Sequence, residues 1–205
     1  MNCPLCKHPG KLFFRNDFFA CDGCSGLYRN KTFYPTPEEE RKRYEEHNND
    51  VHDENFRKFV SPVTRHVLAH FRPDHRGLDF GSGTGPVVSE VLKGKGYDIR
   101  QYDPFFADDP ALLRENYDYI VCCEVMEHFH DPDAEFRMLH RLLKSTGHLI
   151  CMTHLYGERI EFKRWYYKED KTHVFIYHRD TIRHIAGNYA FKDYSIDDRL
   201  IVFQK

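Results

Sequence analysis

The chain has 205 residues, 40% of them hydrophobic and 30% charged, with a formal net charge of −2. These values support one packed α/β domain with a small appendage, and they exclude a disordered chain or one drawn by its overall charge to nucleic acid or membranes. No apolar run approaches the ~20 residues of a membrane helix, and the start Met1-Asn2-Cys3-Pro4 lacks a signal segment, so we expect a cytoplasmic protein.

Two Cys-x-x-Cys pairs stand in residues 1–35: Cys3 with Cys6 and, after 14 intervening residues, Cys21 with Cys24. Two such turns can supply four thiolates to one tetrahedral ion; zinc is favoured and iron stays open. A redox pair or free cysteines would not explain two pairs. Residues 1–35 are therefore predicted to form a metal-stapled module similar to a zinc ribbon. Its five basic and two acidic side chains leave contact with RNA open, beside a structural or partner-docking role.

A helical linker is predicted over residues 36–60. Thr36 can cap a helix over 37–48, because a proline follows it and Glu39 completes a capping box. A break is expected at Asn48-Asn49-Asp50. Apolar residues then recur at helical spacing from 53 to 71, and Ser61-Pro62 is expected to kink this stretch or divide it into two helices.

Strands and helices alternate through the rest of the chain. Strands are predicted at 77–80, 98–102, 117–123 and 147–153, and helices at 85–93, 131–144 and 179–186. The last two segments, 190–195 and 199–204, are typical of an antiparallel pair of strands. This alternation predicts a parallel, doubly wound sheet.

The first of these strands enters a glycine-rich turn, Asp79-Phe80-Gly81-Ser82-Gly83-Thr84-Gly85. Glycines let backbone N–H groups approach a ligand closely, because they carry no Cβ. A dinucleotide-binding turn needs a small residue at its sixth position, where Pro86 stands here. A nicotinamide oxidoreductase is therefore not expected.

An acid two residues before the first of three alternating glycines resembles the first motif of class I S-adenosylmethionine-dependent methyltransferases. The resemblance covers roughly residues 55–205. It implies a Rossmann-like, mostly parallel, doubly wound sheet with an antiparallel last strand, and a methyltransferase domain at 61–205 that follows the module at 1–35 and the linker at 36–60. In that family the loop wraps the methionine part of the cofactor, and the acid supports the loop and the cofactor's amino group.

The resemblance extends to the ends of the second and fourth strands. Asp103 ends the second strand, where an acid can accept both ribose hydroxyls. The stretch after the fourth strand falls at the edge where open parallel sheets bind ligands. The residues expected to bind the cofactor are Asp79, Gly81, Ser82, Gly83, Gly85, Tyr102, Asp103, Pro104, Cys123, Glu124, Val125 and His128.

One departure from the family lies between Asp103 and Tyr117. Only 13 residues separate them, too few for the family's third strand and the helix before it. The acid that often holds the adenine amino group after that strand has no counterpart here. Stacking of adenine on Phe105 or Phe106 is the alternative.

Residues 154–178 crowd aromatic and titratable side chains after the fifth strand, where they can fold over the cofactor's methyl group. Thr172-His173 matches a Thr-His pair of methyltransferases similar to those of small molecules and quinone precursors, with Lys171 where that pattern has proline. Each histidine can act as a general base or as a structural side chain that bonds backbone. The candidates for the transfer step are His128, His173, Tyr166 and Asp170.

These patterns together predict a methyltransferase that uses S-adenosylmethionine and carries a structural zinc ion. No Asn/Asp-Pro-Pro-Tyr signature of amino-group methylation follows the fourth strand, where Glu124-Val125-Met126-Glu127 stands. This favours an oxygen or carbon acceptor, or a small molecule; an RNA or protein acceptor stays open, and no oligomeric state is predicted. The alternative is a degenerate methyltransferase fold that recruits a protein or RNA partner through the zinc ribbon.

Overall fold

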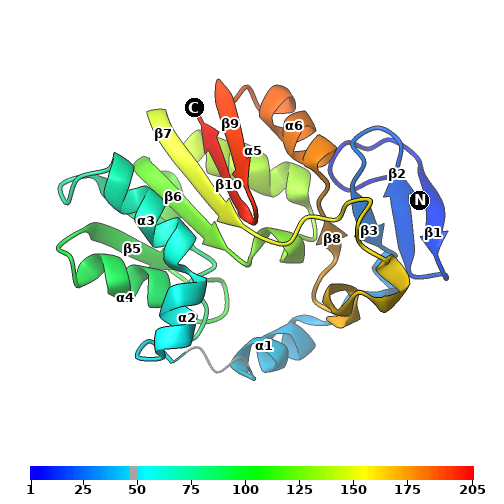
Figure 1. Ribbon diagram of the computed structural model, residues 1–205, viewed down its shortest axis with the longest axis horizontal. Coiled ribbons are helices and arrows are strands. Elements are labelled where there is room, and N and C mark those ends of the chain that lie inside the picture. Colours follow the sequence, from blue (N-terminus) through cyan, green and yellow to red (C-terminus); the bar gives the residue numbers. More distant parts are fainter. Residues whose placement is uncertain (47–49) are drawn as a thin grey trace.

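The computed structural model describes residues 1–46 and 50–205, so the end of the helix predicted over 37–48 and most of the break predicted at 48–50 lie outside the described residues. Figure 1 shows a central sheet with helices on both faces and a smaller sheet beside it. The expected α/β architecture with a small N-terminal sheet is confirmed. Within the described ranges, no helix is long and apolar enough to cross a bilayer.

The central sheet has six strands in the order β5-β4-β6-β7-β10-β9. The first four run parallel to one another, and β10 pairs antiparallel with both β7 and β9. The expected parallel sheet with an antiparallel end is therefore confirmed. The strands are β4 (Arg76–Phe80), β5 (Asp98–Tyr102), β6 (Tyr117–Cys123), β7 (Leu143–Met152), β9 (Asp193–Asp197) and β10 (Leu200–Gln204).

Residues 103–116 form no strand, so β5 is an edge strand, as the short spacing in the sequence predicts. This segment turns sharply where Asp103 and Ala107 exchange two backbone hydrogen bonds of 3.1 and 3.0 Å. Its one regular piece is the 3-10 turn η2 (Leu112–Arg114). The carboxyl ends of β4 and β5 are consequently closed by a compact loop instead of another strand and helix.

The alternation of side chains along β6 explains why helices cover both faces of the sheet. Tyr119 and Val121 pack into one core cluster, whereas Ile120 and Cys122 pack into the other. The first cluster is covered by α2 (Glu54–Phe59), α3 (Ser61–His70) and α4 (Val87–Lys93), and the second by α5 (Pro132–Leu142) and α6 (Arg179–Asn188). Both clusters hold side chains with no solvent exposure, so β6 is the centre of the fold.

The N-terminal sheet is completed by a strand from the other end of the chain. β1 (Gly10–Phe14), β2 (Phe18–Cys21) and β3 (Leu27–Arg29) form an antiparallel meander, and β8 (Phe175–Ile176) pairs antiparallel with β3. The β3–β8 register joins Leu27 to Ile176 and Tyr28 to Phe175. Figure 1 shows β8 beside β3, at the edge of the small sheet that faces the central one. The small sheet therefore shares its hydrogen bonds and its core with the rest of the molecule.

Arg29 adds a second connection between the two sheets. The side chain is 5% exposed and donates from Nη1 to both carboxylate oxygens of Asp17, at 3.0 and 2.8 Å. Nη2 donates to the carbonyl oxygens of Lys168 and Asp170, at 2.8 and 3.1 Å, and Nε to that of His173 at 3.3 Å. One buried guanidinium thus fixes the backbone over residues 168–173 to the N-terminal sheet.

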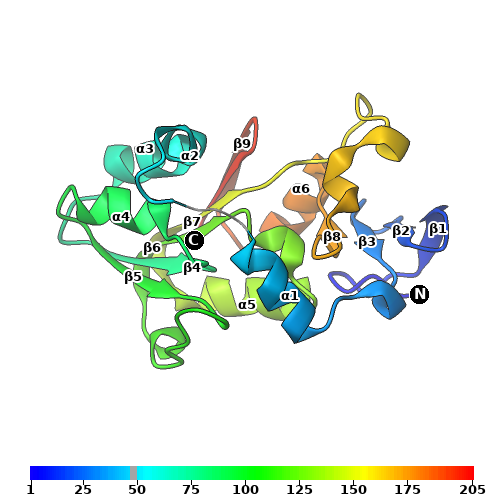
Figure 2. The same cartoon turned by 90° about the horizontal axis from the view of Figure 1, so that it is seen from below.

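The helix α1 (Pro37–Glu45) begins as the sequence predicts. Thr36 Oγ1 accepts from the backbone N–H of Glu39 at 3.3 Å, and the Glu39 carboxylate accepts from that of Thr36 at 2.8 Å. The predicted division of residues 53–71 is also confirmed, since α2 and α3 meet at Val60. In Figure 1, α1 lies below the central sheet, and Figure 2 views the molecule from that side.

Several element boundaries differ from prediction. β7 begins at Leu143 instead of 147, and β9 spans Asp193–Asp197 instead of 190–195. α4 begins at Val87 instead of 85, because Pro86 has a ψ of 65°, outside the helical range. The helix predicted over 131–144 ends at Leu142, because Leu143 already pairs with Tyr117 in the sheet. α6 continues through Gly187-Asn188, and the left-handed residue after it is Ala190, with a φ of 57°.

Candidate active site and metal module

The glycine loop leaves the carboxyl end of β4 and is held against the end of β5. The backbone N–H groups of Gly81 and Ser82 both donate to the carbonyl oxygen of Tyr102, at 2.8 and 3.2 Å. Gly81 and Gly83 have φ values of 78° and 63°, which glycine adopts without strain. A Cβ on Gly81 would lie 2.6 Å from the side chain of Val125. The loop therefore needs glycine at this position to close against the segment that follows β6.

Asp79 lies buried at the base of this loop, with 4% of its surface exposed. Ser89 Oγ in α4 donates to its Oδ2 at 2.7 Å. Burial raises the pKa of Asp79 to about 6, and the bonds from Ser89 counter only part of that effect. The ionised carboxylate is therefore poorly stabilised by the protein alone, and a positively charged ligand group near it would be attracted.

Asp103 fastens the loop after β5 to the glycine loop. Its Oδ2 accepts from Gly83 N at 2.9 Å, and its Oδ1 accepts from the backbone N–H groups of Phe105 and Phe106, at 2.8 and 3.1 Å. A carboxylate offers about four acceptor positions, so these three bonds leave one, on Oδ2. Asp103 thus shapes both loops and retains room for a single further donor.

The short 3-10 turn η3 (Met126–His128) follows β6 beside the glycine loop. Glu127 in this turn is 1% exposed. Its Oε1 accepts from the Tyr167 hydroxyl at 2.6 Å and its Oε2 from Thr153 Oγ1 at 3.0 Å. Burial raises the pKa of Glu127, and nearby His173 and these hydrogen bonds oppose the rise. Glu127 is thus a buried carboxyl group fixed by two hydroxyl groups, and no motif in the sequence marks it as a site residue.

Glu124 occupies the residue at which the chain leaves β6, with a left-handed φ of 55°. Burial raises the pKa of its carboxyl to about 8; the neighbouring Glu127 adds to the rise, and Arg199 opposes it from 3.6 Å. Arg199 was not anticipated from the sequence. A signal for it exists, because β10 is antiparallel to β7 and Leu200 pairs with Met152, so the turn before β10 must reach the carboxyl edge of the parallel strands.

His128 and His173 lie next to each other, with ring centroids 4.9 Å apart. Nδ1 of His128 bonds the carbonyl oxygen of Thr172 at 2.9 Å, and Nδ1 of His173 bonds that of Tyr167 at 2.7 Å. Burial lowers the pKa of His173, which favours the neutral ring. Tyr44 from α1 packs on His128, with centroids 5.3 Å apart. The structure thus brings together the two histidines proposed for the transfer step.

The other two candidates for that step are placed differently. Tyr166 is 67% exposed, and its hydroxyl contacts His154 Nε2 at 3.2 Å. Asp170 accepts from Thr172 Oγ1 at 2.6 Å through Oδ1, and from Arg43 at 2.9 Å through Oδ2. Burial alone would raise the pKa of Asp170, but the hydrogen bonds from Thr172 and the charges of His173 and Arg43 hold it well below its usual range. The carboxylate ties α1 to the loop that carries His173.

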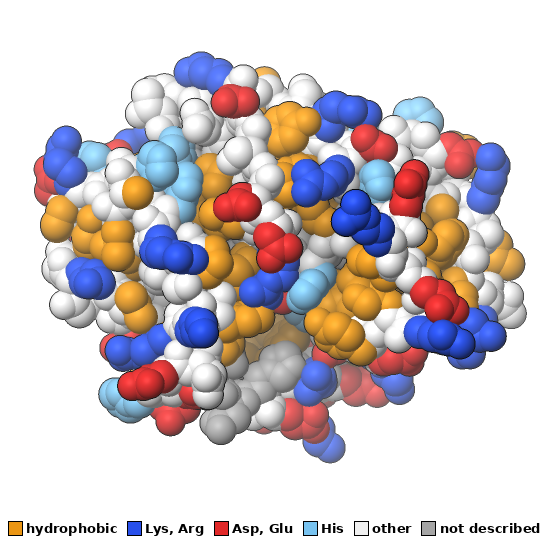
Figure 3. All heavy atoms as spheres, viewed as in Figure 1, with side chains coloured by type: hydrophobic (Ala, Val, Ile, Leu, Met, Phe, Trp, Pro, Cys, Tyr) orange, Lys and Arg blue, Asp and Glu red, His pale blue; other side chains and the backbone are white. Residues whose placement is uncertain are grey.

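The residues expected to bind the cofactor gather at one edge of the central sheet. They follow the adjacent parallel strands β4, β5 and β6, which end side by side. The tilted rings of Phe105 and Phe106, which the sequence offers for adenine, face α1: Tyr44 lies 5.7 Å from the first and the Arg41 guanidinium 5.6 Å from the second. In Figure 3 the surface is hollowed between the two halves of the molecule, with hydrophobic side chains within the hollow.

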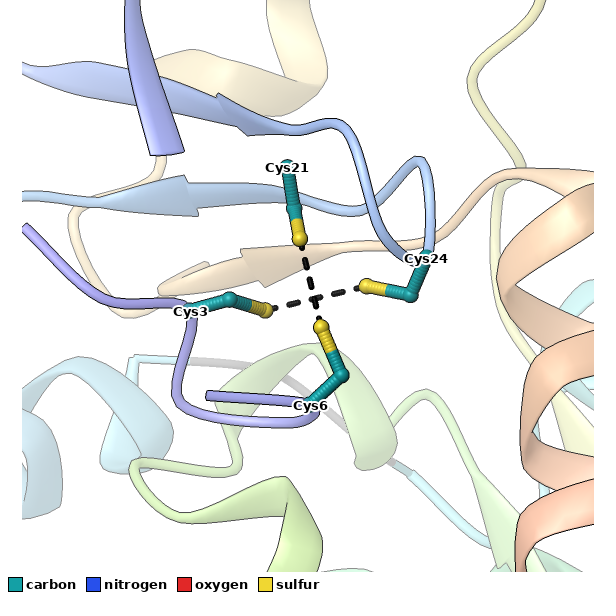
Figure 4. A group of neighbouring side chains, drawn as sticks. All are labelled: Cys3, Cys6, Cys21 and Cys24. Carbon is teal, nitrogen blue, oxygen red and sulfur yellow. Dashed lines mark hydrogen bonds between the residues drawn. The ribbon is translucent and has the colours of Figure 1, made fainter. Parts of the chain in front are cut away.

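The four cysteines Cys3, Cys6, Cys21 and Cys24 converge from two turns of the N-terminal module (Figure 4). All four sulfur atoms lie within 4.8 Å of one another; Cys3 and Cys24 are 3.7 Å apart, and Cys6 and Cys21 3.2 Å. Zn–S bonds of 2.3 Å would place sulfurs about 3.8 Å apart in a tetrahedron, so the cluster fits such an ion.

The two cysteine turns have the same backbone. Lys7 N bonds the carbonyl of Cys3, and Ser25 N bonds that of Cys21, at 3.0 and 2.9 Å. Lys7 and Ser25, each directly after the second cysteine of its pair, have φ values of 62° and 60°. The two matching turns direct their four thiols to one point. Free cysteines with no common ligand would not need this matching geometry.

Comparison with known families and curated proteins assigns the larger part of the chain. A family model described as a methyltransferase domain matches residues 51–196. The ubiquinone biosynthesis O-methyltransferase of Ruegeria pomeroyi is 35% identical over 77 residues, and that of Pseudomonas syringae pv. tomato is 30% identical over 78. These matches cover 38% of this chain and 31% and 33% of the relatives, so the chain spans about a third of their length.

Solved structures share the fold at low sequence identity. A SAM-dependent methyltransferase from Archaeoglobus fulgidus is similar with a TM-score of 0.57 and 17% identity, over 73% of this chain and 94% of that one. A phosphoethanolamine N-methyltransferase from Haemonchus contortus, in complex with S-adenosylhomocysteine, is similar with a TM-score of 0.51 and 18% identity, over 66% of this chain and 38% of that one. At these identities the likeness concerns the architecture of the chain.

Proposed function

The chain belongs to the methyltransferase-domain family, and we propose that it transfers the methyl group of S-adenosylmethionine to a small-molecule acceptor. The observation that carries this proposal is the glycine loop. Its left-handed Gly81 and Gly83 expose backbone at the carboxyl edge of the sheet, with one buried carboxylate beneath them and another beside them. A cofactor with a sulfonium, an amino group and a ribose complements that arrangement.

In the proposed complex each element of the edge takes one part of the cofactor. The glycine loop wraps the methionine part, and Asp79 supplies negative charge near its amino group. Asp103 accepts one ribose hydroxyl through the free position on Oδ2; this is narrower than the bidentate acceptance expected from the sequence, since three backbone bonds already use the carboxylate. Adenine stacks on the aromatic ring of Phe105 in this proposal.

An oxygen acceptor is the form of the reaction that the site supports best. The curated relatives that match this chain are named O-methyltransferases. The segment after β6 carries Glu124 and Glu127 beside two histidines, which are groups that can bind or deprotonate a hydroxyl. The enzyme then has to hold that oxygen in line with the sulfonium methyl and exclude water.

The four-cysteine module is proposed to hold a structural zinc ion. Four thiolates and no open position describe a structural site, so the ion takes no part in methyl transfer. The ion would stabilise the turn that joins β2 and β3. Because β3 pairs with β8, it would also help to position β8 and the loop before it.

Calorimetric titration with S-adenosylmethionine and S-adenosylhomocysteine tests the proposal. We expect both to bind, and Asp103→Ala to weaken binding by about 1–3 kcal/mol, the contribution of a hydrogen bond to a charged group together with the loss of loop support. Asp108→Ala, at an exposed position of the same loop, is the control. Absence of binding at millimolar cofactor would refute the assignment and leave the fold as a binding module.

A further inference from the structure

Strand β5 leaves one edge of the central sheet open. Among the strands that the structure describes it pairs only with β4, because residues 103–116 form no strand beside it. Figure 2 shows β5 at one side of the sheet, below α4. An exposed strand edge can bond a further strand, which another molecule can supply. We propose that this edge pairs antiparallel with β5 of a second copy of the chain, so that two central sheets join about a two-fold axis.

The backbone groups of Ile99 and Gln101 face the open side of β5. The carbonyl oxygen of Tyr102 accepts from Gly81 N at 2.8 Å, so the backbone of Tyr102 faces β4. Successive residues of a strand direct their N–H and C=O groups to opposite sides, so Gln101 faces away from β4, and so does Ile99. Each of these two residues therefore offers one donor and one acceptor to a strand of another molecule.

A groove of about 610 Å³ lies along this edge, between the end of α4 and the loop that follows β5. Its lining includes Lys93 of α4, residues 98–101 of the strand and Asp108 of the loop. The side-chain nitrogen Nε2 of Gln101 is buried and has no hydrogen-bond partner within the described part of the chain. An unpartnered buried amide is unfavourable in the isolated molecule. A second chain that enters the groove can supply the missing acceptor.

The charges of β5 favour one register for its pairing with a second β5. Outward-facing residues must oppose outward-facing residues in an antiparallel pair. When Ile99 opposes Ile99 of the second copy, Asp98 of each copy lies opposite Arg100 of the other, and such cross-strand pairs of opposite charge stabilise a sheet. These two side chains are 48% and 61% exposed, so both can reach a partner. A shift that places Ile99 opposite Gln101 would bring the two Arg100 side chains together, and like charges oppose that register.

The charges that flank β5 complement each other in the same arrangement. Lys93 and Lys95 precede the strand, Asp108 and Asp109 follow it, and all four side chains are exposed. Antiparallel pairing brings the amino end of each β5 beside the carboxyl end of the other. In the proposed dimer the lysines of one copy therefore face the aspartates of the other, at both ends of the interface.

The opposite edge of the sheet lacks this self-complementarity. The edge strand there is β9, whose charged residues are Asp193 and Asp197 at its two ends. Antiparallel pairing of two β9 strands over their full length would place these aspartates opposite one another, so their charges would repel. The charge pattern thus distinguishes β5 from β9 as the edge that joins two copies.

The proposed axis leaves both cofactor sites accessible. Antiparallel pairing directs the carboxyl ends of the two sets of parallel strands away from each other. The glycine loop of each copy follows the carboxyl end of β4, so the two loops lie at opposite ends of the joined sheet. With only five residues in β5, the interface is small, and we expect a dimer that dissociates at micromolar concentrations.

Sedimentation equilibrium of the zinc-loaded chain tests the interface. We expect the wild type to dimerise, and Arg100→Asp and Asp98→Arg each to raise the dissociation constant ~10-fold or more, because each change converts two pairs of opposite charge into two pairs of like charge. Asp193→Arg, a charge reversal on β9, is the matched control and should dimerise as the wild type.

Two restorations test the register. The double variant Asp98→Arg/Arg100→Asp exchanges the charges and should dimerise again. An equimolar mixture of the two single variants should form a heterodimer, because each then carries the charges that complement the other. A monomeric wild type, equal dimerisation by the single variants, or failure of both restorations would overturn the proposal. S-adenosylhomocysteine binding by calorimetry should be the same for all these variants, which confirms that each is folded.

Discussion

Replacing Asp79 by asparagine should stabilise the fold while weakening cofactor binding. The wild-type carboxyl is buried, with a pKa raised from 3.8 to about 6, so ionising it in the folded protein is unfavourable. Asparagine has almost the same shape, and its oxygen can still accept from Ser89 Oγ. It carries no charge, so it avoids the unfavourable ionisation and loses the attraction for the cofactor's amino group.

The pH dependence of this difference follows from the two pKa values. Well below pH 3.8 the Asp79 carboxyl is protonated in both the folded and the unfolded chain, so its shifted pKa does not change the free energy of unfolding. Between 3.8 and 6 the unfolded chain releases the proton first, so wild-type stability falls as pH rises; above 6 the loss is constant at about 3 kcal/mol. At pH 5 the loss is about 1.6 kcal/mol by the same relation. The variant should therefore gain about 1.4 kcal/mol relative to wild type between pH 5 and pH 8.

Urea denaturation of both proteins at pH 5 and pH 8, without cofactor, measures this difference. Asp98→Asn, an exposed carboxyl on the neighbouring strand β5, controls for the general loss of a negative charge. A stability difference between Asp79→Asn and wild type that is the same at both pH values would refute the argument, because it would show that burial does not penalise the charged form. Calorimetry at pH 8 should show weaker S-adenosylmethionine binding by the variant.

Three further outcomes are expected. Gly81→Ala should lower cofactor affinity ~10-fold or more, since its Cβ would lie 2.6 Å from Val125 at a left-handed φ; calorimetric affinity equal to wild type would contradict this. Arg29→Met should destabilise the protein by about 3–5 kcal/mol in urea titrations, because it leaves Asp17 and three backbone carbonyls without their buried partner; a change under 1 kcal/mol would show that the connection is unimportant. Elemental analysis should find about one zinc at the cysteine site, and Cys24→Ser should lose most of it and lower the melting temperature; full zinc retention would exclude this cysteine as a ligand.

Local chemistry made much of the fold predictable. The capping box at Thr36, the division at Ser61-Pro62 and the parallel strands all follow from patterns within a few residues, and each is present in the structure. The missing third strand was predictable from chain length between Asp103 and Tyr117. Paired Cys-x-x-Cys turns likewise predict which four cysteines meet.

Features that join distant parts of the chain were not predictable in the same way. β8 has two residues, and its partner Leu27 stands 149 positions before Ile176, so no local periodicity indicates the pairing. The position of His173 beside Glu127 depends on the loop over residues 168–173, which the hydrogen bonds of Arg29 and Asp170 hold in place. Neither Arg29 nor Asp170 is part of a recognisable sequence motif. Asp103 shows the converse: its strand-end position was predicted, but the backbone bonds that use most of its carboxylate depend on the tight turn after it.

The pairing of β3 with β8 limits where the protein chain can be shortened without loss of structure. A truncation that begins after β3 would remove the strand that pairs with Phe175 and Ile176, and it would expose Phe175 and Tyr177, which share an apolar core with Leu5 and Tyr28. The N-terminal module therefore cannot be replaced freely by another zinc ribbon. A replacement would have to supply a strand with the geometry of β3, so that β8 keeps its partner.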